Sequence, residues 1–473
     1  MNWRTVTHGI GRHKKSSIQS LPAELLLIIF KFVHDAVLLS ENDGIWGEHW
    51  CIRDPLSPFL FPYSIAAVCP LWRAVASMVP EFWTRVVVLV DKPPTPLSDI
   101  HYQLSWSREL PLDVTVTRRG PRHTIDEPHE KIWAYAAMSM IRPHLRRCTS
   151  VRFNVKLSSS LPSFPNDFPA PVPNLRRLEL QCSEDDSGGT ARLTSITSAE
   201  QAEYKFPALA RLIIDGRNYY DACRKASPIE WAHMFPNLLG LAVSRFKSGP
   251  RDSFTARDLM SPLVELPLES LRITDLDLAP LPSRSDPIAV LDHLSFLALE
   301  DLPIIERMND ILDFLSTVDE ITMTRCVTSH LPTLSTYDAE LRLDDIGIHH
   351  DLAPVLLRWQ GRELDVNNCS GFNNAVLALM SARNAETGRF IYARYVRRLR
   401  ITDCPCFTVA ALKHLVDVRR KPPAQNPANI PLTTHFRELS VTGDVPRLSS
   451  EDRHWFHDLV PDFRYHSNND DEQ

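Results

Sequence analysis

The stretch Leu268-Glu269-Ser270-Leu271-Arg272-Ile273-Thr274-Asp275-Leu276 carries the pattern that decides the fold. Apolar residues occupy its first, fourth and sixth positions, and a further apolar residue follows three places later. Alternation of apolar and polar residues over so short a run predicts a β-strand with one buried face. The same Leu-x-x-Leu-x-Leu pattern, with other apolar residues at some positions, recurs at Leu175/Leu178/Leu180, Leu209/Leu212/Ile214, Leu238/Leu241/Val243, Leu294/Leu297/Leu299, Val318/Ile321/Met323, Val396/Leu399/Ile401 and Phe436/Leu439/Val441. Partial copies without the first apolar position occur at Leu341/Leu343 and Leu364/Val366.

A second regularity follows each of these strands. Three residues after the last apolar position a small or apolar residue recurs, as Phe246, Leu276, Leu302, Cys326, Ile346, Cys369 and Cys404. This is the Leu-x-Leu-x-x-Cys portion of a leucine-rich repeat. The repeated choice of Cys at this place is typical of a small buried hydrophobe rather than a reactive thiol.

Successive central positions of the repeat lie 20 to 40 residues apart, room for a strand and a helix in each unit. Apolar residues at helical spacing predict helices at Asp310–Thr317, Leu352–Trp359, Phe372–Arg383 and Phe407–Arg419. A strand–helix unit has one apolar face that it cannot bury alone. We therefore expect neighbouring units to stack into a solenoid, with insertions accounting for the irregular spacing.

Strand and helix patterns also alternate before and after the explicit repeat. Strands are predicted at Val86–Val90, Leu110–Val116 and Val151–Val155, and helices at Leu97–Glu109 and Asp126–Arg147. Such alternation implies parallel strands. A helix at 447–459, followed by Val460–Tyr465, is expected to cap the array. The sequence thus predicts an α/β, leucine-rich-repeat-like solenoid over residues 86–465.

Upstream of the solenoid, three short motifs follow one another. They are Leu-Pro-x-Glu-Leu-Leu-x-x-Ile-Phe at 21–30, Val-Cys-x-x-Trp-Arg at 68–73 and Pro-x-x-Trp at 80–83. Pro22 suits the first turn of a helix, where a missing N–H is not needed. One apolar stripe is predicted along this helix, formed by Leu25, Leu26, Ile29, Phe30 and Val33. Two short helices with so much apolar surface cannot bury all of it against each other, so a partner or the rest of the chain must cover the surplus.

Together these motifs resemble the F-box, and the layout of the chain resembles the large F-box-like families of mushroom-forming fungi. The resemblance is specific over residues 18–90 and covers 91–465 only as architecture. It implies a short all-helical domain at residues 18–85, with a loop insertion at 34–62, that docks on the Skp adaptor of a cullin–RING ubiquitin ligase. The adaptor contact it implies comprises Leu21, Pro22, Leu25, Leu26, Ile29, Phe30, Val68, Cys69, Trp72, Arg73 and Trp83. The alternative is an N-terminal helical hairpin packed on its own domain.

Composition restricts the partners of the chain. A net charge of −6 over 473 residues argues against nucleic acid or an anionic membrane surface as partner. No apolar run approaches the about 20 residues needed to cross a bilayer.

Residues 1–17 lack a secretory signal and are interpreted as a disordered leader, and residues 466–473 are interpreted as a flexible tail. Nine scattered cysteines are expected to be free thiols in the cytoplasm or nucleus. The basic run Arg419-Arg420-Lys421 is interpreted as a solvated face.

Motifs for catalysis, cofactors and metals are absent from the sequence. It has no phosphate-binding loop, dinucleotide fingerprint or nucleophile elbow. Cys404-Pro405-Cys406 has no second Cys or His pair at zinc spacing. His454 and His457 could share a helix face, but the adjacent Trp455 and Phe456 favour a capping core over a metal site. Ubiquitin transfer itself requires a thioester cysteine or a zinc-built platform, and the sequence has neither. We therefore expect no enzyme activity, no cofactor and no metal.

The resulting hypothesis is a substrate-recognition subunit of an SCF-type ubiquitin ligase. The N-terminal helices would bind the Skp adaptor and, through it, the cullin–RING ligase, while the solenoid would bind a protein target. Such a subunit acts by holding its target near a ubiquitin-charged E2 enzyme. The alternative is a leucine-rich-repeat scaffold that assembles proteins without directing their degradation.

Overall fold

The computed structural model describes residues 21–39, 60–120, 127–168, 171–186, 206–224, 226–248, 253–281, 291, 294–302, 305–326, 333–334, 339–421 and 435–468. The predicted leader at 1–17 lies outside the described residues. So do residues 40–59 of the predicted insertion and residues 469–473 of the predicted tail.

The chain divides into two compact units. Unit 1 comprises Met1–Val87 and Thr95–Thr115, and unit 2 comprises Val88–Pro94 and Val116–Gln473. Helices and parallel strands alternate along the described chain, so the predicted α/β class is confirmed.

Unit 1 begins with three helices, α1 (Ala23–Leu39), α2 (Tyr63–Ala66) and α3 (Pro70–Ser77). A 3₁₀ turn at Pro80–Trp83 then leads into strand β1 (Arg85–Leu89), which is followed by helix α4 (Leu97–Trp106) and strand β2 (Leu112–Thr117). The unit boundary falls within both strands, which are hydrogen-bonded neighbours. Prolines open α3 and the 3₁₀ turn, where their missing N–H groups would have no helical partner.

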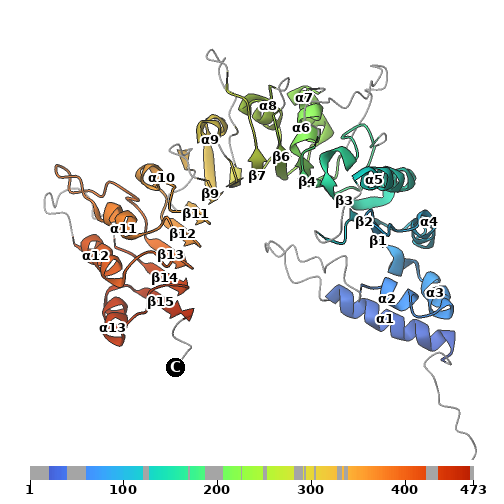
Figure 1. Cartoon of the computed structure of the whole chain (residues 1–473), viewed down its shortest axis with the longest axis horizontal. Helices are drawn as coiled ribbons and strands as arrows, with labels where there is room; N and C mark the ends of the chain where they lie inside the picture. The colour runs from blue at the N-terminus through green and yellow to red at the C-terminus, as the bar shows by residue number, and fades with distance from the viewer. Residues whose placement is uncertain are drawn as a thin grey trace, which may run out of the picture. The chain divides into compact units, whose positions relative to one another are not determined.

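Unit 2 contains the rest of the regular structure. Its strands are β3 (Cys148–Leu157), β4 (Arg177–Glu184), β5 (Arg211–Asp215), β6 (Gly240–Phe246), β7 (Ser270–Leu276), β8 (Leu294–Glu300), β9 (Thr317–Thr324), β10 (Thr333–Leu334), β11 (Glu340–Asp344), β12 (Glu363–Asn367), β13 (Arg398–Thr402), β14 (Glu438–Gly443) and β15 (Asp462–Ser467). Its helices are α5 (Glu127–Ile141), α6 (Gly216–Cys223), α7 (Pro228–Met234), α8 (Ala256–Met260), α9 (Ile305–Leu312), α10 (Ala353–Arg358), α11 (Asn374–Ser381), α12 (Val409–Arg420) and α13 (Ser450–Leu459). In Figure 1 these helices lie along one side of the strands, and none of the described helices of unit 2 covers the other side.

The strands of unit 2 form one parallel sheet in chain order. The hydrogen-bonded order runs from β3 to β9 and from β11 to β15, with β11 beside β9 and with the short β10 also on β9. Every central position predicted from the repeat lies in register with the next, from Leu178 through Leu212, Leu241, Leu271, Leu297, Ile321, Leu341, Leu364 and Leu399 to Leu439. Val151 of β3 and Phe463 of β15 extend this leucine ladder at its two ends. All of its members are buried, and each leucine contributes about 1.5–3 kcal/mol to the core.

A left-handed backbone turn ends most ladder strands. The residues with this conformation have φ between 51° and 61° and are Arg245, Asp275, Asp301, Arg325, Asp345, Asn368 and Asp403. Asp and Asn tolerate this conformation better than most residues, which explains their frequency in the series. The next residue is in each case the predicted closing residue, and all seven closing residues are buried. The turn therefore directs the closing side chain into the core.

Three sequence predictions in unit 2 are wrong. The tail predicted from residue 466 starts too early, because β15 extends to Ser467, which is buried. The helix predicted at Asp310–Thr317 is α9, which spans Ile305–Leu312, and Thr317 already begins β9. Its apolar spacing continued through Phe314 and Leu315, which are buried in the connection between the two elements. Arg419 does not lie on a solvated face, because its side chain is buried while that of Arg420 is exposed.

Candidate functional site: the apolar face of helix α1

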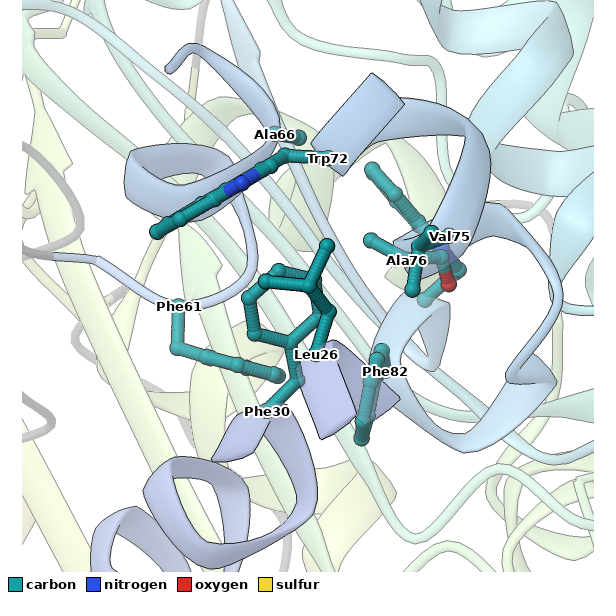
Figure 2. Packing of buried hydrophobic residues seen from close by; sticks show 9 residues of the cluster. Leu26, Phe30, Phe61, Ala66, Trp72, Val75, Ala76 and Phe82 are labelled. Atoms are coloured by element: carbon teal, nitrogen blue, oxygen red, sulfur yellow. The ribbon is translucent and has the colours of Figure 1, made fainter. Parts of the chain in front are cut away.

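One side of α1 packs into the core of unit 1. Leu26 and Phe30, one helical turn apart, are buried together with Phe61, Trp72 and Phe82. Figure 2 shows these side chains meeting from α1, from the segment before α2, from α3 and from the 3₁₀ turn. The rings of Phe61 and Phe82 meet edge to face, with 4.9 Å between their centroids. Edge-to-face aromatic pairs of this kind fix the relative positions of the elements that carry them.

The third motif closes this core through Trp83. Its indole Nε1 donates a hydrogen bond to the carbonyl oxygen of Ala76 on α3, at 3.0 Å, and its ring packs against that of Trp106 on α4. Tyr63 holds the neighbouring strand, because its hydroxyl accepts a hydrogen bond from Val87 N and lies 2.9 Å from Gln103 Oε1. Burial raises the pKa of Tyr63 well above its usual range, so this hydroxyl stays protonated and acts as a donor.

The opposite side of α1 is apolar and exposed. Its side chains, at spacing i, i+3, i+4, i+7 and i+8, are Leu25, Ile28, Ile29, Phe32 and Val33. Phe32 is 72% exposed and Ile28 51% exposed, values that are unusual for side chains of this size. We call these five residues the α1 face. Val68, Leu71 and Met78, in and beside α3, are also exposed.

Helix α1 is therefore apolar on two sides, of which unit 1 covers only one. A helix that is apolar all round is normally buried on all sides. Polar exposed residues of α1 are confined to a narrow strip that includes Glu24, Lys31 and Asp35. Exposed apolar groups clustered in this way mark interaction sites on soluble proteins.

The eleven residues of the predicted adaptor contact fall into three groups. The exposed ones are Pro22, Leu25, Ile29, Val68 and Arg73. Leu21 and Cys69 are half-buried. The buried ones are Leu26, Phe30, Trp72 and Trp83. The buried group supports the helices from inside, and the exposed group, with part of the two half-buried residues, presents a surface to another molecule.

Sequence reasoning assigned one apolar stripe to α1, but the structure divides it. Leu26 and Phe30 face the core, whereas Leu25, Ile29 and Val33 face outward. Ile28 and Phe32 belong to the outward face and were not among the predicted contact residues. The signal that would have found them is the spacing 25, 28, 29, 32 and 33, which is that of a complete second helical stripe.

Arg73, the last residue of the second motif, connects α3 with α2. Its Nε donates a hydrogen bond to the carbonyl oxygen of Ala66, the last residue of α2, at 3.2 Å. A cation at this place also complements the negative end of the short helix. Arg73 is exposed overall, so this bond holds its side chain while leaving part of it accessible.

Within the described residues, no group of three or more His, Cys, Asp or Glu side chains gathers to suit a metal ion. Among the described helices, none combines the length and apolar character needed to span a lipid bilayer. Comparisons of the sequence with models of known protein families and with curated protein sequences find no match.

Proposed function

We propose that this chain is the substrate-recognition subunit of an SCF-type cullin–RING ubiquitin ligase. In this proposal α1 to α3 and the 3₁₀ turn at Pro80–Trp83 form an F-box-like domain that binds a Skp-type adaptor. Unit 2 is a leucine-rich-repeat-like solenoid that binds a protein target. The observation that carries the proposal is the α1 face, because five apolar side chains lie exposed on a helix whose other side is fixed in the core.

The arrangement of the three motifs supports this choice of partner. The motif residues that unit 1 buries hold α1 and α3 in place, while the neighbouring motif residues Leu25, Ile29 and Val68 remain exposed. Burying the α1 face against a second protein would remove large apolar side chains from water, the main favourable term in protein association. The resemblance of the motifs to the F-box supports a Skp-type adaptor as that second protein.

The role proposed for the chain is a non-catalytic one. The adaptor and cullin bring a ubiquitin-charged E2 enzyme, and the solenoid holds the target nearby. Tethering converts an encounter between free molecules into a local one, with an effective concentration that reaches the millimolar range for short connections. The transfer of ubiquitin from the E2 enzyme then depends on the position of a lysine in the target, and no group of this chain takes part in it.

Binding of the purified full-length chain to an immobilised Skp-type adaptor tests the proposal. The double substitution Ile28→Glu with Phe32→Glu places two carboxylates in the α1 face without touching the core of unit 1. We expect it to reduce adaptor affinity at least about 100-fold, because each buried unpaired charge costs several kcal/mol. The matched control is Lys31→Glu, which introduces a carboxylate on the polar strip of the same helix.

Two results would contradict the proposal. One is equal adaptor binding by the double variant and the wild-type chain, with both folded by circular dichroism. The other is equal loss of binding by Lys31→Glu, since a charge outside the α1 face should leave the contact intact.

The scaffold alternative makes a different prediction about proteins bound to unit 2. A ligase receptor captured from cells with the proteasome inhibited should bring down ubiquitin-modified proteins, and the Ile28→Glu/Phe32→Glu variant should bring down the same proteins without the modification. A scaffold would bring them down unmodified in both cases.

A further inference from the structure

Two cysteines occupy equivalent places on neighbouring strands of unit 2. Cys369 closes β12 and Cys404 closes β13, each directly after the residue with the left-handed backbone conformation. The two strands pair in register as far as Asn367 and Thr402, so the cysteines are the second residues beyond the same pair. Among the seven closing residues of the repeat, this is the one place where two cysteines are neighbours.

The two cysteines are in direct contact. The backbone N–H of Cys369 donates a hydrogen bond to the Sγ of Cys404, with 3.3 Å between nitrogen and sulfur. A hydrogen bond between the two thiol groups lowers the pKa of Cys404 and raises that of Cys369. Neighbouring strands lie about 4.8 Å apart, and residues joined by a disulfide have Cα atoms about 4.4–6.8 Å apart. The spacing of the strands therefore suits a bond between the two sulfur atoms.

The pair lies at the edge of the core. Both side chains are buried, but the adjacent residues Asn368 and Pro405 are exposed, and so is Cys406. Exposed turns open locally at a lower free-energy cost than core strands. A small opening of these turns would admit an oxidant as small as hydrogen peroxide to the two sulfurs.

Cys326 provides a comparison within the same chain. It closes β9, is buried, and has its Sγ 3.3 Å from the carbonyl oxygen of Leu299 on the neighbouring strand β8. The closing residues on either side of it are Leu302 and Ile346, so no cysteine neighbours it in the series. Burial raises the pKa of Cys326 to about 12. The two places thus differ in the presence of a second thiol rather than in burial.

We propose that Cys369 and Cys404 form a reversible disulfide when hydrogen peroxide oxidises the chain, and that this bond joins the repeats of β12 and β13. The proposal is independent of the proposed ligase function. It assigns an oxidative modification site to the solenoid.

The oxidation takes place in two steps. The Cys404 thiolate attacks one oxygen of the peroxide, the O–O bond breaks, and the sulfur becomes a sulfenic acid while the departing hydroxide takes up the thiol proton to form water. The Cys369 sulfur then attacks the Cys404 sulfur, the S–O bond breaks, and a second water leaves with the Cys369 proton. The two thiols together give two electrons to the peroxide.

We expect this disulfide to be easily reduced. In the dithiol state the Sγ of Cys369 lies 3.2 Å from the carbonyl oxygen of Leu343 and accepts a hydrogen bond from Ile346 N at 3.3 Å. Formation of the disulfide removes the thiol hydrogens, so a carbonyl oxygen in the core loses a donor. Because this loss favours the dithiol state, glutathione should reverse the oxidation.

Peptide mapping of the full-length chain by mass spectrometry tests the proposal. The purified chain is treated with hydrogen peroxide, its remaining thiols are blocked with an alkylating reagent under denaturing conditions, and it is digested without reduction. We expect a disulfide-linked pair of peptides that contain Cys369 and Cys404, with Cys326 recovered as a blocked thiol. Treatment of the oxidised chain with glutathione before blocking should remove the linked pair.

Three substitutions locate the bond. Cys404→Ser should abolish the link to Cys369. Cys326→Ser is the matched control, because it changes a buried closing residue outside the pair and should leave the link in place. Cys406→Ser removes the exposed thiol next to the pair and should also leave the link in place. If Cys404→Ser fails to fold, mapping of the wild-type and Cys406→Ser chains decides the question without it.

Three results would overturn the proposal. The first is the absence of the link between Cys369 and Cys404 after Cys406 has been oxidised. The second is a different link in its place, either within the chain between Cys404 and Cys406 or between the Cys406 residues of two chains. The third is a link that glutathione does not reduce in the folded chain, since the proposed bond is a reversible one.

Discussion

The ring of Phe30 on α1 meets the indole of Trp72 on α3 edge to face, with 5.1 Å between the ring centroids. Both residues belong to the motifs at 21–30 and 68–73, and both are buried. This contact joins the two helices whose other sides carry exposed apolar groups. Helices α1 and α3 therefore each contribute one side to the core of unit 1 and expose apolar side chains on another side.

Replacement of Phe30 by Ala should destabilise unit 1 by about 3–5 kcal/mol, because it removes a buried ring and leaves a cavity beside Trp72. Phe32→Ala is the matched control, since Phe32 lies on the α1 face two residues away and should change stability by less than about 0.5 kcal/mol. Urea unfolding followed by tryptophan fluorescence measures both. Equal effects of the two substitutions would contradict the division of α1 into a core side and an exposed side.

The sequence of unit 1 predicted the helices α1, α3 and α4, but not the direction of each side chain. The loop insertion predicted from residue 34 is wrong at its start, because α1 continues to Leu39. Apolar residues occupy Leu25, Leu26, Ile29 and Phe30, so two adjacent stripes overlap and periodicity alone does not separate them. The separation comes from Phe61 and Phe82, which are distant in sequence and pack with the stripe that contains Leu26 and Phe30. Contacts of this kind are tertiary, and no local pattern specifies them.

The leucine ladder gives a second prediction. Leu341→Ala removes a fully buried side chain from the core between sheet and helices and should destabilise unit 2 by about 2–5 kcal/mol. Arg342→Ala, one residue further and on the sheet face away from the helices, should have an effect of at most about 1 kcal/mol. Thermal unfolding by calorimetry gives both values. A larger effect of Arg342→Ala would contradict the assigned direction of β11.

Arg419 gives a third prediction, because its guanidinium holds together segments far apart in the sequence. It donates hydrogen bonds to the carbonyl oxygens of Ala393 at 2.9 Å, Met380 at 3.1 Å, and Val396 and Tyr392 at 3.3 Å. Burial and the nearby positive charge of Arg383 lower the pKa of Arg419 to about 9, so it remains charged at pH 7.

Arg419→Met should therefore destabilise unit 2 by roughly 3 kcal/mol or more, because a side chain of similar length leaves these carbonyl groups buried without a donor. The adjacent Arg420→Met changes an exposed side chain and is the control, with an expected effect within about 0.5 kcal/mol. Denaturant unfolding measures both. Similar stability of the two variants would contradict the bridging role of Arg419.

Arg419 also shows where the sequence was least informative. Three consecutive basic residues resemble a solvated face, and nothing local reveals that carbonyl groups from 380 to 396 converge on the first of them. By contrast, the ladder of unit 2 was predicted position by position, since its period-two pattern is local and recurs in each unit. The helix α6 was missed because it opens with Gly216, Arg217 and Asn218, although Asp215 caps it by accepting a hydrogen bond from Asn218 N.

A fourth prediction concerns pH. Arg325 lies between two acidic turns, with its Nε 2.6 Å from Asp301 Oδ1 and its guanidinium also bound to Glu300 and Asp345. Its hydrogen bond to Asp301 lowers the pKa of that carboxyl. A carboxyl whose pKa is lower in the folded state stabilises the fold above its unfolded pKa of about 3.9, and this contribution is lost as the pH falls through the folded value.

Arg325→Gln should thus reduce the stability of unit 2 by up to about 1 kcal/mol at pH 7, since these side chains are partly exposed and screened. The difference in the free energy of unfolding between this variant and the wild-type chain should shrink below about pH 4 and in 1 M salt. Unfolding curves recorded across that pH range measure it. A difference that grows as the pH falls would contradict the assigned role of Asp301.

The central claim is that a Skp-type adaptor covers the exposed apolar face of α1. Hydrogen–deuterium exchange of the full-length chain, measured by mass spectrometry with and without a Skp-type adaptor, tests it most directly. The account predicts slower exchange in Ala23–Leu39 and Pro70–Ser77, with the ladder strands of unit 2 unchanged. A complex in which α1 exchanges as fast as in the free chain, or the absence of any complex, would contradict it.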